Sequence, residues 1–404
     1  MAKFINLKPF KDFFRSGQIG GVLLMLAVII SLTLANIGFY DNFHSVLNYP
    51  IGYEPWHLRY SVEMWINDGL MAIFFLLVGL EIKREILEGE LSSISRAVLP
   101  IFAAAGGMLF PAGIYALFNS GTTSASGWGI PMTTDIAFAL AVISMLGKRV
   151  PTSLKVFLAA LAIVDDLGAI LVIALFYTEE VHVTQLLYAG GILALLAAMN
   201  AMGVKKIVFY LIPGIFLWYF IHHSGIHATI AGVLLAFTIP TNPIKLESPL
   251  EKLEHSLTGP VNYLIMPIFA LANTNIRFEA AMLDGVTSRM GMGIILGLIV
   301  GKTLGVSLFS YLAVKLGLST LPSRSSWKHI IGLGMLAGIG FTMSVFIAML
   351  SFDNLEHQSE AKFSILIASI LAGGLGYAFL SFVYRKRVKR ILRSKEEIKS
   401  LGYE

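Results

Sequence analysis

The chain has 404 residues, of which 56% are hydrophobic and 14% are charged, and its formal net charge is +5. A mean hydropathy of +0.75 excludes an ordinary soluble globular protein and indicates a polytopic membrane protein. Because cysteine is absent, disulfides, thiolate metal sites and cysteine nucleophiles are excluded. The histidines are scattered without the spacing of a zinc site, and the sequence indicates no cofactor.

The chain begins with residues 1–16, where basic residues alternate with apolar ones as in an amphipathic segment at a membrane interface. An apolar run from Ile19 to Ile37 follows. Because this run is too long for a typical signal-peptide core and no small-x-small cleavage site is clear, we expect a retained first span rather than a cleaved signal peptide.

Apolar windows recur along the chain and end at glycine, proline or charge clusters, as membrane spans do. With the first run they predict an all-α polytopic membrane protein with twelve transmembrane helices, in one transporter domain over residues 1–404. The further windows are 65–86, 97–118, 128–146, 153–176, 184–201, 206–221, 226–239, 257–273, 291–316, 329–350 and 362–384.

Most of the 30 lysine and arginine residues fall on alternate connections, so the positive-inside rule places these connections and both termini in the cytoplasm. The other side holds only Arg59, Arg277, Arg289 and Lys362. The basic tail, residues 385–404, could also suggest binding of nucleic acid or anionic lipid. We interpret the tail as a topology determinant and expect no nucleic-acid partner.

Two adjacent carboxylates, Asp165 and Asp166, lie in the middle of the apolar window 153–176. An ionised carboxylate in hydrocarbon is costly, so such residues face a protein interior or a water-filled cavity. A pair side by side therefore indicates a cation site. Because neighbouring residues on a helix diverge by about 100°, we expect one aspartate to pair with a partner and the other to line the cavity.

The fourth and eleventh spans each contain an interruption. Gly129 and Pro131 weaken the fourth span just before Asp135. Residues 129–135 and 338–344 both read Gly-Ile-x-x-Thr and then a polar residue two places later. Glycine that serves close helix packing is the alternative interpretation. We favour paired interruptions, which predict inverted repeats in spans 3–5 and 10–12, two crossed broken helices and a midplane binding site.

Crossed broken helices bring like partial charges together, positive at their amino ends and negative at their carboxyl ends. We expect Asp135 to neutralise the amino ends and Lys302 the carboxyl ends. Lys302 lies about eleven residues into its span, roughly 16 Å at 1.5 Å per residue. This depth predicts a buried partner, either Asp165 or Asp166.

The oxygens of Asp165 and Asp166, with a hydroxyl from Thr134 and waters, suit Na⁺ or Li⁺ rather than a soft metal. Protons compete for the same oxygens. A site that holds either a cation or protons supports antiport when it is coupled to alternating access. Asp68, near the outer end of the second span, fits a solvated position or a pore mouth equally well.

Four stretches look familiar: Val164–Ala169, Pro131–Phe138, Phe75–Glu85 and Ser224–Thr229. Together they resemble the NhaA family of bacterial sodium/proton antiporters, and the match covers nearly the whole chain. The resemblance implies a transporter of the bacterial cell inner membrane, and not an enzyme. It would exchange cytoplasmic Na⁺ or Li⁺ for external protons, be activated at alkaline pH, and serve pH and sodium homeostasis.

The resemblance also implies roles for single residues. Asp165 and Asp166 would bind the cation and the protons, with Asp135 and Thr134 beside them and Lys302 as the buried positive partner. A pH-sensing cluster at the cytoplasmic side would comprise Glu81, Arg84, Glu85, Glu254 and His255.

His227 is a further pH-response candidate by resemblance, although a lone histidine near an interface is more often structural. A histidine that the family often carries three residues beyond His255 is Thr258 here, so we expect a shifted pH profile. Without the resemblance, the charges from Glu81 to Glu90 would be interpreted as a solvated helix end.

The first external connection, residues 45–59, resembles the β-hairpin through which the family pairs protomers. Pro50 and Pro55 would limit its strands. The expected partners are therefore Na⁺, Li⁺, H⁺, the lipid bilayer and a second copy of the chain.

Two other functions fit part of the pattern. A sodium-coupled solute symporter could use a similar scaffold, but the fixed charge of Lys302 favours proton exchange over a second bound Na⁺. An intramembrane aspartyl protease needs carboxylates that converge from separate spans. Asp135 and Asp166 could do so, but the chain has no Gly-x-Gly-Asp element. A non-catalytic scaffold would not retain these buried charges against their desolvation cost.

Overall fold

The computed structural model describes residues 8–178, 181–241, 248–278 and 280–400. Side chains at positions 8–18, 148, 280–281, 283 and 386–400 lie outside the description as well. The predicted interfacial segment 1–16 and most of the basic tail 385–404 therefore fall on residues or side chains that are not described.

The chain folds almost entirely into helices. The α-helices are α1 (Lys8–Asn36), α2 (Tyr40–Leu47), α3 (Val62–Met64), α4 (Met71–Leu87), α5 (Ile94–Asn119), α6 (Ile136–Met145), α7 (Thr152–Phe176), α8 (Val183–Ala201), α9 (Val208–His222), α10 (Ile230–Thr238), α11 (Pro249–Pro260), α12 (Met266–Asn273), α13 (Ala280–Thr287), α14 (Arg289–Leu296), α15 (Lys302–Lys315), α16 (Trp327–Ala337), α17 (Phe341–Ser351) and α18 (Leu355–Ser400). The 3₁₀ helices are η1 (Glu54–Trp56), η3 (Ala125–Met132) and η4 (Gly147–Arg149), and the π-helices are η2 (Trp65–Leu70), η5 (Val261–Ile265) and η6 (Gly297–Gly301).

Seven helical stretches in the described residues are long and apolar enough to cross a membrane. The pair α16 and α17, bent by 46° at its break, makes an eighth if it counts as one span. The predicted class, an all-α polytopic membrane protein, is therefore confirmed. The remaining predicted windows coincide with the shorter helices α4, α9, α10 and α12, and the count of twelve spans stays a prediction.

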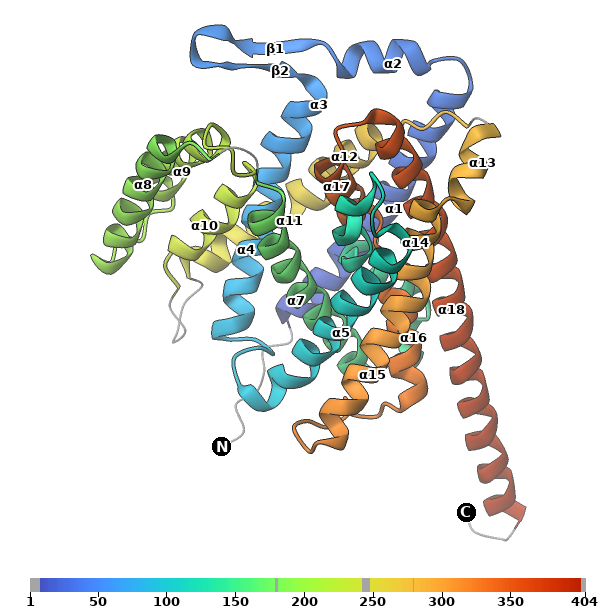
Figure 1. The fold of residues 1–404 in the computed structure, drawn as a ribbon. Coiled ribbons are helices and arrows are strands. Elements are labelled where there is room, and N and C mark those ends of the chain that lie inside the picture. The colour runs from blue at the N-terminus through green and yellow to red at the C-terminus, as the bar shows by residue number, and fades with distance from the viewer. Residues whose placement is uncertain (1–7, 179–180, 242–247, 279, 401–404) are drawn as a thin grey trace.

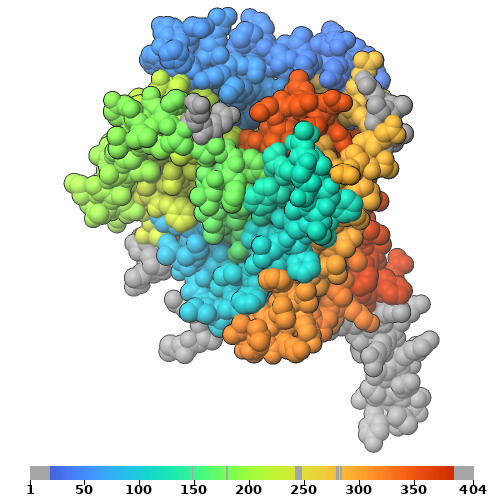
Figure 2. All heavy atoms as spheres, in the orientation of Figure 1, coloured from blue at the N-terminus to red at the C-terminus, as the bar shows by residue number. Residues whose placement is uncertain are grey.

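Figure 1 shows the helices gathered in a bundle, with α2 and the hairpin of β1 (Pro50–Tyr53) and β2 (Leu58–Ser61) laid across one end and the last turns of α18 extending beyond the other. In Figure 2 the same hairpin and α2 cover that end as a continuous blue surface. Helix α8 lies at the edge of the bundle, where only 11% of its membrane-crossing window is buried, against 67% for α7.

The predicted hairpin is present, slightly later in the chain than the sequence suggests. Strands β1 (Pro50–Tyr53) and β2 (Leu58–Ser61) pair antiparallel, whereas Ser45 belongs to α2. Gly52 has a φ of +130°, and a Cβ atom there would overlap the carbonyl oxygen of Leu58. Glycine is therefore required inside β1.

The first broken helix differs from the prediction in where it breaks. A 3₁₀ helix, η3, continues through Pro131 to Met132, and helical structure is lost only at positions 133–135 before α6 begins. The proline is tolerated because its fixed φ near −65° also suits a 3₁₀ helix. In the other broken helix, positions 338–340 separate α16 from α17.

Two glycines bring α5 and α15 into close contact. A Cβ atom at Gly106 would overlap the carbonyl oxygen of Gly305, and a Cβ atom at Gly305 would overlap that of Gly106. Small residues let membrane helices pack backbone against backbone in this way. Because Lys302 lies about one turn before Gly305, this contact fixes the position of the lysine relative to α5.

We expect Gly106→Ala to destabilise the protein by about 1–3 kcal/mol, because the added methyl group must push α15 away from α5. Gly113→Ala is the matched control on the same helix, since no heavy atom lies within 4 Å of a Cβ atom at that position. Thermal unfolding of the purified variants in detergent measures the difference. Equal Tm values for the two variants would show that α15 moves aside without cost.

Candidate cation and proton site

The buried lysine meets one of the two adjacent aspartates. Lys302 Nζ donates a hydrogen bond to Asp165 Oδ2 at 2.5 Å, and the exposed fraction of both side chains is 0%. Of the two partners that the sequence left open, the structure selects Asp165. The hydrogen bond of Lys302 goes to this carboxylate, and its role in neutralising the carboxyl ends of the broken helices stays a prediction.

The π-helix η6 ends immediately before Lys302. A π-helical turn inserts an extra residue and therefore rotates the residues that follow it. Its two end glycines pack against prolines: a Cβ atom at Gly301 would lie 2.8 Å from Pro111 Cα, and one at Gly297 would lie 2.8 Å from Pro131 Cβ. The turn that presents the lysine is thus held between α5 and η3.

Thr134 connects this ion pair to both broken helices. Its hydroxyl oxygen lies 2.7 Å from Asp165 Oδ2 and 2.8 Å from the carbonyl oxygen of Ala337, the last residue of α16. The hydroxyl has one proton, so it donates to only one of these acceptors at a time. A single buried side chain in the first break therefore touches the aspartate and the end of the other broken helix.

Two carboxylate oxygens at this site have no hydrogen-bond partner: Asp165 Oδ1 and Asp166 Oδ1, both buried. The negative charges of Asp165, Glu81 and Asp135 act on Asp166. An ionised Asp166 in this position needs a cation or a proton to offset its burial. Among the described residues, no group of three or more histidine, aspartate and glutamate side chains forms a metal site. Hydroxyl, backbone or water oxygens would therefore complete the shell of any cation held here.

Asp135 closes the amino ends of both broken helices. Its Oδ1 accepts from the backbone N–H of Phe138 in α6 at 3.1 Å. Its Oδ2 accepts from the backbone N–H of Thr342 in α17 at 3.2 Å and from the Thr342 hydroxyl at 2.5 Å. A carboxylate at two helix amino ends offsets the partial positive charge of both.

The two breaks bind each other reciprocally. Thr133 and Asp135 hold the same positions in the first motif as Thr342 and Ser344 hold in the second. Thr133 Oγ1 lies 3.2 Å from Ser344 Oγ, and Asp135 bonds Thr342. Two bonds to backbone carbonyl oxygens follow the same pattern: Asp135 N donates to Ile339 O at 2.6 Å, and the Ser344 side-chain Oγ donates to Ile130 O at 2.8 Å. Each polar position in one motif thus contacts a different position in the other.

The predicted cytoplasmic cluster comes together between the end of α4 and helix α11. Arg84 Nε donates to both carboxylate oxygens of Glu254, at 3.0 and 2.9 Å, and Arg84 Nη1 lies 3.0 Å from Glu85 Oε1. The charges of Glu81 and His255 also act on members of this group. Burial raises the pKa of Glu254, and the facing guanidinium opposes that rise.

His227 lies away from this cluster, beside Asp68. Its Nε2 is 3.9 Å from Asp68 Oδ1, while His222 Nδ1 is 3.4 Å from Asp68 Oδ2. Asp68, in η2, therefore lies between the imidazole of His222 at the end of α9 and that of His227 just before α10. His222 was not among the residues that the sequence indicated.

A protein-family model described as Na+/H+ antiporter 1 matches residues 11–380 of the chain. The chain belongs to this family. A curated Na(+)/H(+) antiporter NhaA 2 from Flavobacterium johnsoniae is 60% identical over 384 residues, which cover 94% of each chain. Na(+)/H(+) antiporter NhaA proteins from Flavobacterium psychrophilum and Bordetella parapertussis are each 48% identical, over 94% and 91% of this chain and 97% and 95% of theirs. The predicted membership of the NhaA antiporters is confirmed.

Among solved structures, the sodium proton antiporter MjNhaP1 from Methanocaldococcus jannaschii matches 92% of this chain and 95% of its own. The TM-score is 0.49 and the sequence identity 14%.

Three residues at the site escaped the sequence analysis as individual candidates: Thr133, Thr342 and Ser344. Their signal was already present in the two copies of Gly-Ile-x-x-Thr. The repeat makes Thr133 equivalent to Thr342, and Asp135 equivalent to Ser344. Only the structure shows that Thr133 contacts Ser344 and that Asp135 contacts Thr342.

We expect Lys302→Gln to destabilise the protein by about 3–5 kcal/mol, because it leaves a buried aspartate without its counter-charge. The double variant Asp165→Asn with Lys302→Gln removes both charges and should recover most of that loss. Lys315→Gln is the control, since this lysine is exposed at the far end of α15. Thermal unfolding of the wild type, the two single variants Lys302→Gln and Asp165→Asn, and the double variant forms the cycle. A double variant no more stable than Lys302→Gln alone would argue against the ion pair as the cause.

Proposed function

We propose that this chain is a secondary antiporter that exchanges cytoplasmic Na⁺ or Li⁺ for external protons at Asp165 and Asp166. The observation that carries the proposal is the pair of buried carboxylate oxygens without partners, one on each aspartate, beside a lysine that already satisfies Asp165 Oδ2. Oxygen ligands of this kind favour small hard cations. The names of the relatives support the same chemistry.

Exchange follows from competition for these oxygens. When protons leave the aspartates, the site gains negative charge and can hold a cation with help from Thr134. When the cation leaves, protons restore neutrality. A site that cannot hold both at once couples the two fluxes, provided that it opens to one side of the membrane at a time.

The proposed architecture has twelve spans, with the broken spans 4 and 11 crossing at inverted repeats. Leaving aside the short helices α2, α3 and α13, the helices combine into twelve units when η2 joins α4, η3 joins α6, the last turn of α11 and η5 join α12, α14 and η6 join α15, and α16 joins α17. The reciprocal contacts of Asp135 with Thr342 and of Thr133 with Ser344 support a local two-fold relation between the breaks. A pseudo-two-fold axis in the membrane plane is the mark of inverted repeats.

The proposed location is the bacterial inner membrane, with both termini in the cytoplasm. The distribution of lysine and arginine supports this orientation. It places the hairpin and α2 outside and the far end of α18 inside (Figure 1).

We propose that the hairpin pairs two copies of the chain into a homodimer. Tyr53 and Trp56 at its tip are 59% and 64% exposed, and exposed aromatic side chains are common at protein interfaces. The hairpin is also anchored to its own protomer, because Trp65 Nε1 donates to the carbonyl oxygen of Ile51 at 2.9 Å.

The proposed pH response resides in the cytoplasmic cluster, with His227 beside Asp68 as a second candidate. The pKa of Glu254 is raised by burial, so this carboxyl ionises at a higher pH than an exposed glutamate. As pH rises through that pKa, Glu254 gains a buried charge that repels Glu81 and Glu85, and its attraction to Arg84 offsets part of this cost. The neutral carboxyl stabilises the packed arrangement of the cluster, and this stability is lost as the carboxyl ionises. The loss favours activation at alkaline pH.

Na⁺-induced proton movement in reconstituted vesicles tests the exchange, with a pH dye as reporter over pH 6.5–8.5. We expect a signal that rises with pH in the wild type and falls at least 100-fold in Asp165→Asn and Asp166→Asn, because each loses a charged cation ligand. Asp41→Asn, on the exposed surface of α2, is the control. Solute uptake driven by Na⁺ without proton movement would replace antiport with symport.

Glu254→Gln should move the activity–pH curve toward alkaline pH, because glutamine keeps the hydrogen bond to Arg84 but cannot gain the repelling charge. The vesicle assay across the same pH range measures the midpoint. Glu88→Gln, exposed just beyond the end of α4, is the control. A midpoint that stays at the wild-type value in Glu254→Gln would remove this residue from the sensor.

A further inference from the structure

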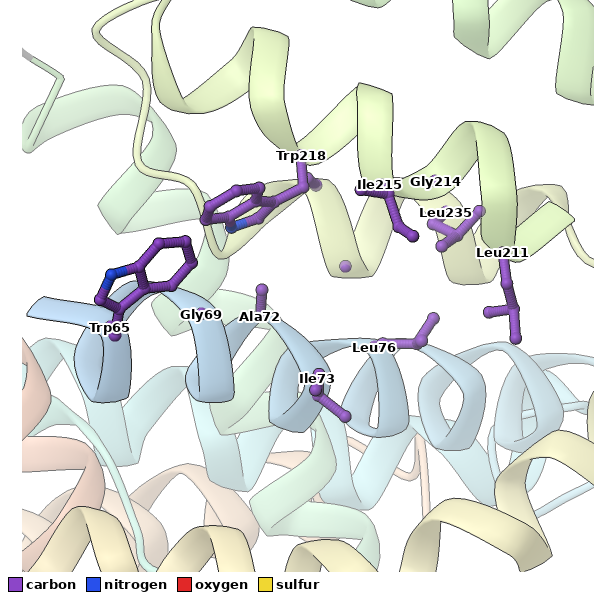
Figure 3. A pocket seen from close by; sticks show the side chains of 12 residues that line it. Trp65, Gly69, Ala72, Ile73, Leu76, Leu211, Gly214, Ile215, Trp218 and Leu235 are labelled. Atoms are coloured by element: carbon purple, nitrogen blue, oxygen red, sulfur yellow. The ribbon is translucent and has the colours of Figure 1, made fainter. Parts of the chain in front are cut away.

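A groove of about 320 Å³ runs between α4 and the helices α9 and α10, and none of its lining residues belongs to the aspartate site. Figure 3 shows its two walls, with one row of side chains on η2 and α4 and the other on α9 and α10. Every lining residue is glycine, alanine, leucine, isoleucine or tryptophan. Water has no set of polar partners in such a space, so the groove favours an apolar occupant.

Two tryptophans close one end of the groove. The rings of Trp65 and Trp218 stack with their centroids 5.9 Å apart, and Figure 3 places them together at that end. Both indole N–H groups are used within the protein: Trp65 donates to the carbonyl oxygen of Ile51 and Trp218, at 3.4 Å, to that of Asp68. Tryptophan at this position is typical of the membrane–water interface.

Small residues keep the groove narrow. A Cβ atom at Gly232 would overlap the carbonyl oxygen of Ala72, and one at Gly214 would overlap Leu235. The three helices therefore approach one another at glycines on both sides of the space.

The length of the groove matches half a bilayer. From Trp65 at the closed end to Leu76 at the other, the helix rises about 16 Å at 1.5 Å per residue, and half of a hydrocarbon core is about 15 Å. An apolar cavity of about 150 Å³ holds one benzene molecule, so a space of about 320 Å³ holds roughly a dozen carbon atoms. This is the size of one extended hydrocarbon chain.

We propose that this groove is a binding site for one acyl chain of an outer-leaflet phospholipid. The proposal rests on the membrane orientation given above and not on the exchange chemistry. The acyl chain fills the space between α4 and α9 from the outer interface to the bilayer centre. Because the walls carry no charge, recognition depends on the hydrocarbon and not on the headgroup.

Photolabelling of the full-length protein in vesicles tests the proposal. The probe is a phosphatidylcholine with a diazirine midway along one acyl chain, and mass spectrometry locates the adducts. We expect adducts on the groove residues Leu76 and Leu235 to exceed those on the exposed helix α8 at least five-fold per residue. Adducts spread in proportion to lipid-exposed surface would show ordinary contact with the bilayer and would overturn the proposal.

Filling the groove provides the matched comparison. Ala72→Phe places a ring between the walls, where Figure 3 shows the Ala72 side chain, and should reduce groove adducts at least five-fold. Ala197→Phe adds the same ring to the exposed face of α8 and should leave them unchanged. Equal groove labelling in both variants would contradict an acyl-chain site. If Ala72→Phe does not fold, Ala72→Leu is the smaller filling variant.

The same labelling with a phosphatidylglycerol that carries the identical chain separates the hydrocarbon from the headgroup. We expect the same adducts at the same yield. A yield that changes several-fold with the headgroup would place recognition outside the groove and overturn the proposal. Because the readout is an adduct, the result is independent of whether the protein exchanges Na⁺ for protons.

Discussion

The bond between Lys302 and Asp165 is the interaction on which the rest of the site depends. Both charges are fully buried, and each alone would carry a large desolvation cost inside a membrane protein. The pair therefore holds α7 and α15 in one relative position. It also leaves the second oxygen of Asp165, and one oxygen of its neighbour Asp166, directed into the interior without a partner. The ion pair thus positions two carboxylate oxygens that have no hydrogen-bond partner and could bind a cation.

The two broken helices leave backbone groups unpaired inside the membrane, and a few side chains supply the missing hydrogen-bond partners. Interrupting a membrane helix exposes backbone N–H and C=O groups that hydrocarbon cannot satisfy. Here each break supplies partners for the other: Asp135 receives N–H groups from α6 and α17, and Thr134 reaches the carboxyl end of α16. Since Thr134 also contacts Asp165, a change in charge at the aspartates acts directly on the geometry of both breaks.

The sequence predicted the fold class and brought Asp165, Asp166 and Lys302 to notice, because a charge in an apolar window is rare and costly. It could not decide which aspartate meets the lysine. That choice depends on the rotation of α15, which the π-helical turn η6 sets, and a single π turn has no clear signal in one sequence. The position of the first break was also missed, since Pro131 is compatible with the 3₁₀ helix that the chain forms there. The groove beside Trp65 was out of reach, because it exists only where glycines of three helices meet.

The reciprocal binding of the two breaks has a consequence for biosynthesis. Asp135 and Thr342 are 207 positions apart in the chain, so the ribosome completes the first break long before its partner exists. During that interval the amino end of α6 can be closed by Asp135 itself, through the N–H of Phe138, but the carbonyl oxygen of Ile130 still lacks the hydroxyl of Ser344. The first half of the protein must therefore wait in the membrane with part of its polar backbone satisfied by water or by the insertion machinery. Assembly of the transport site is consequently a late event, completed only when α17 arrives.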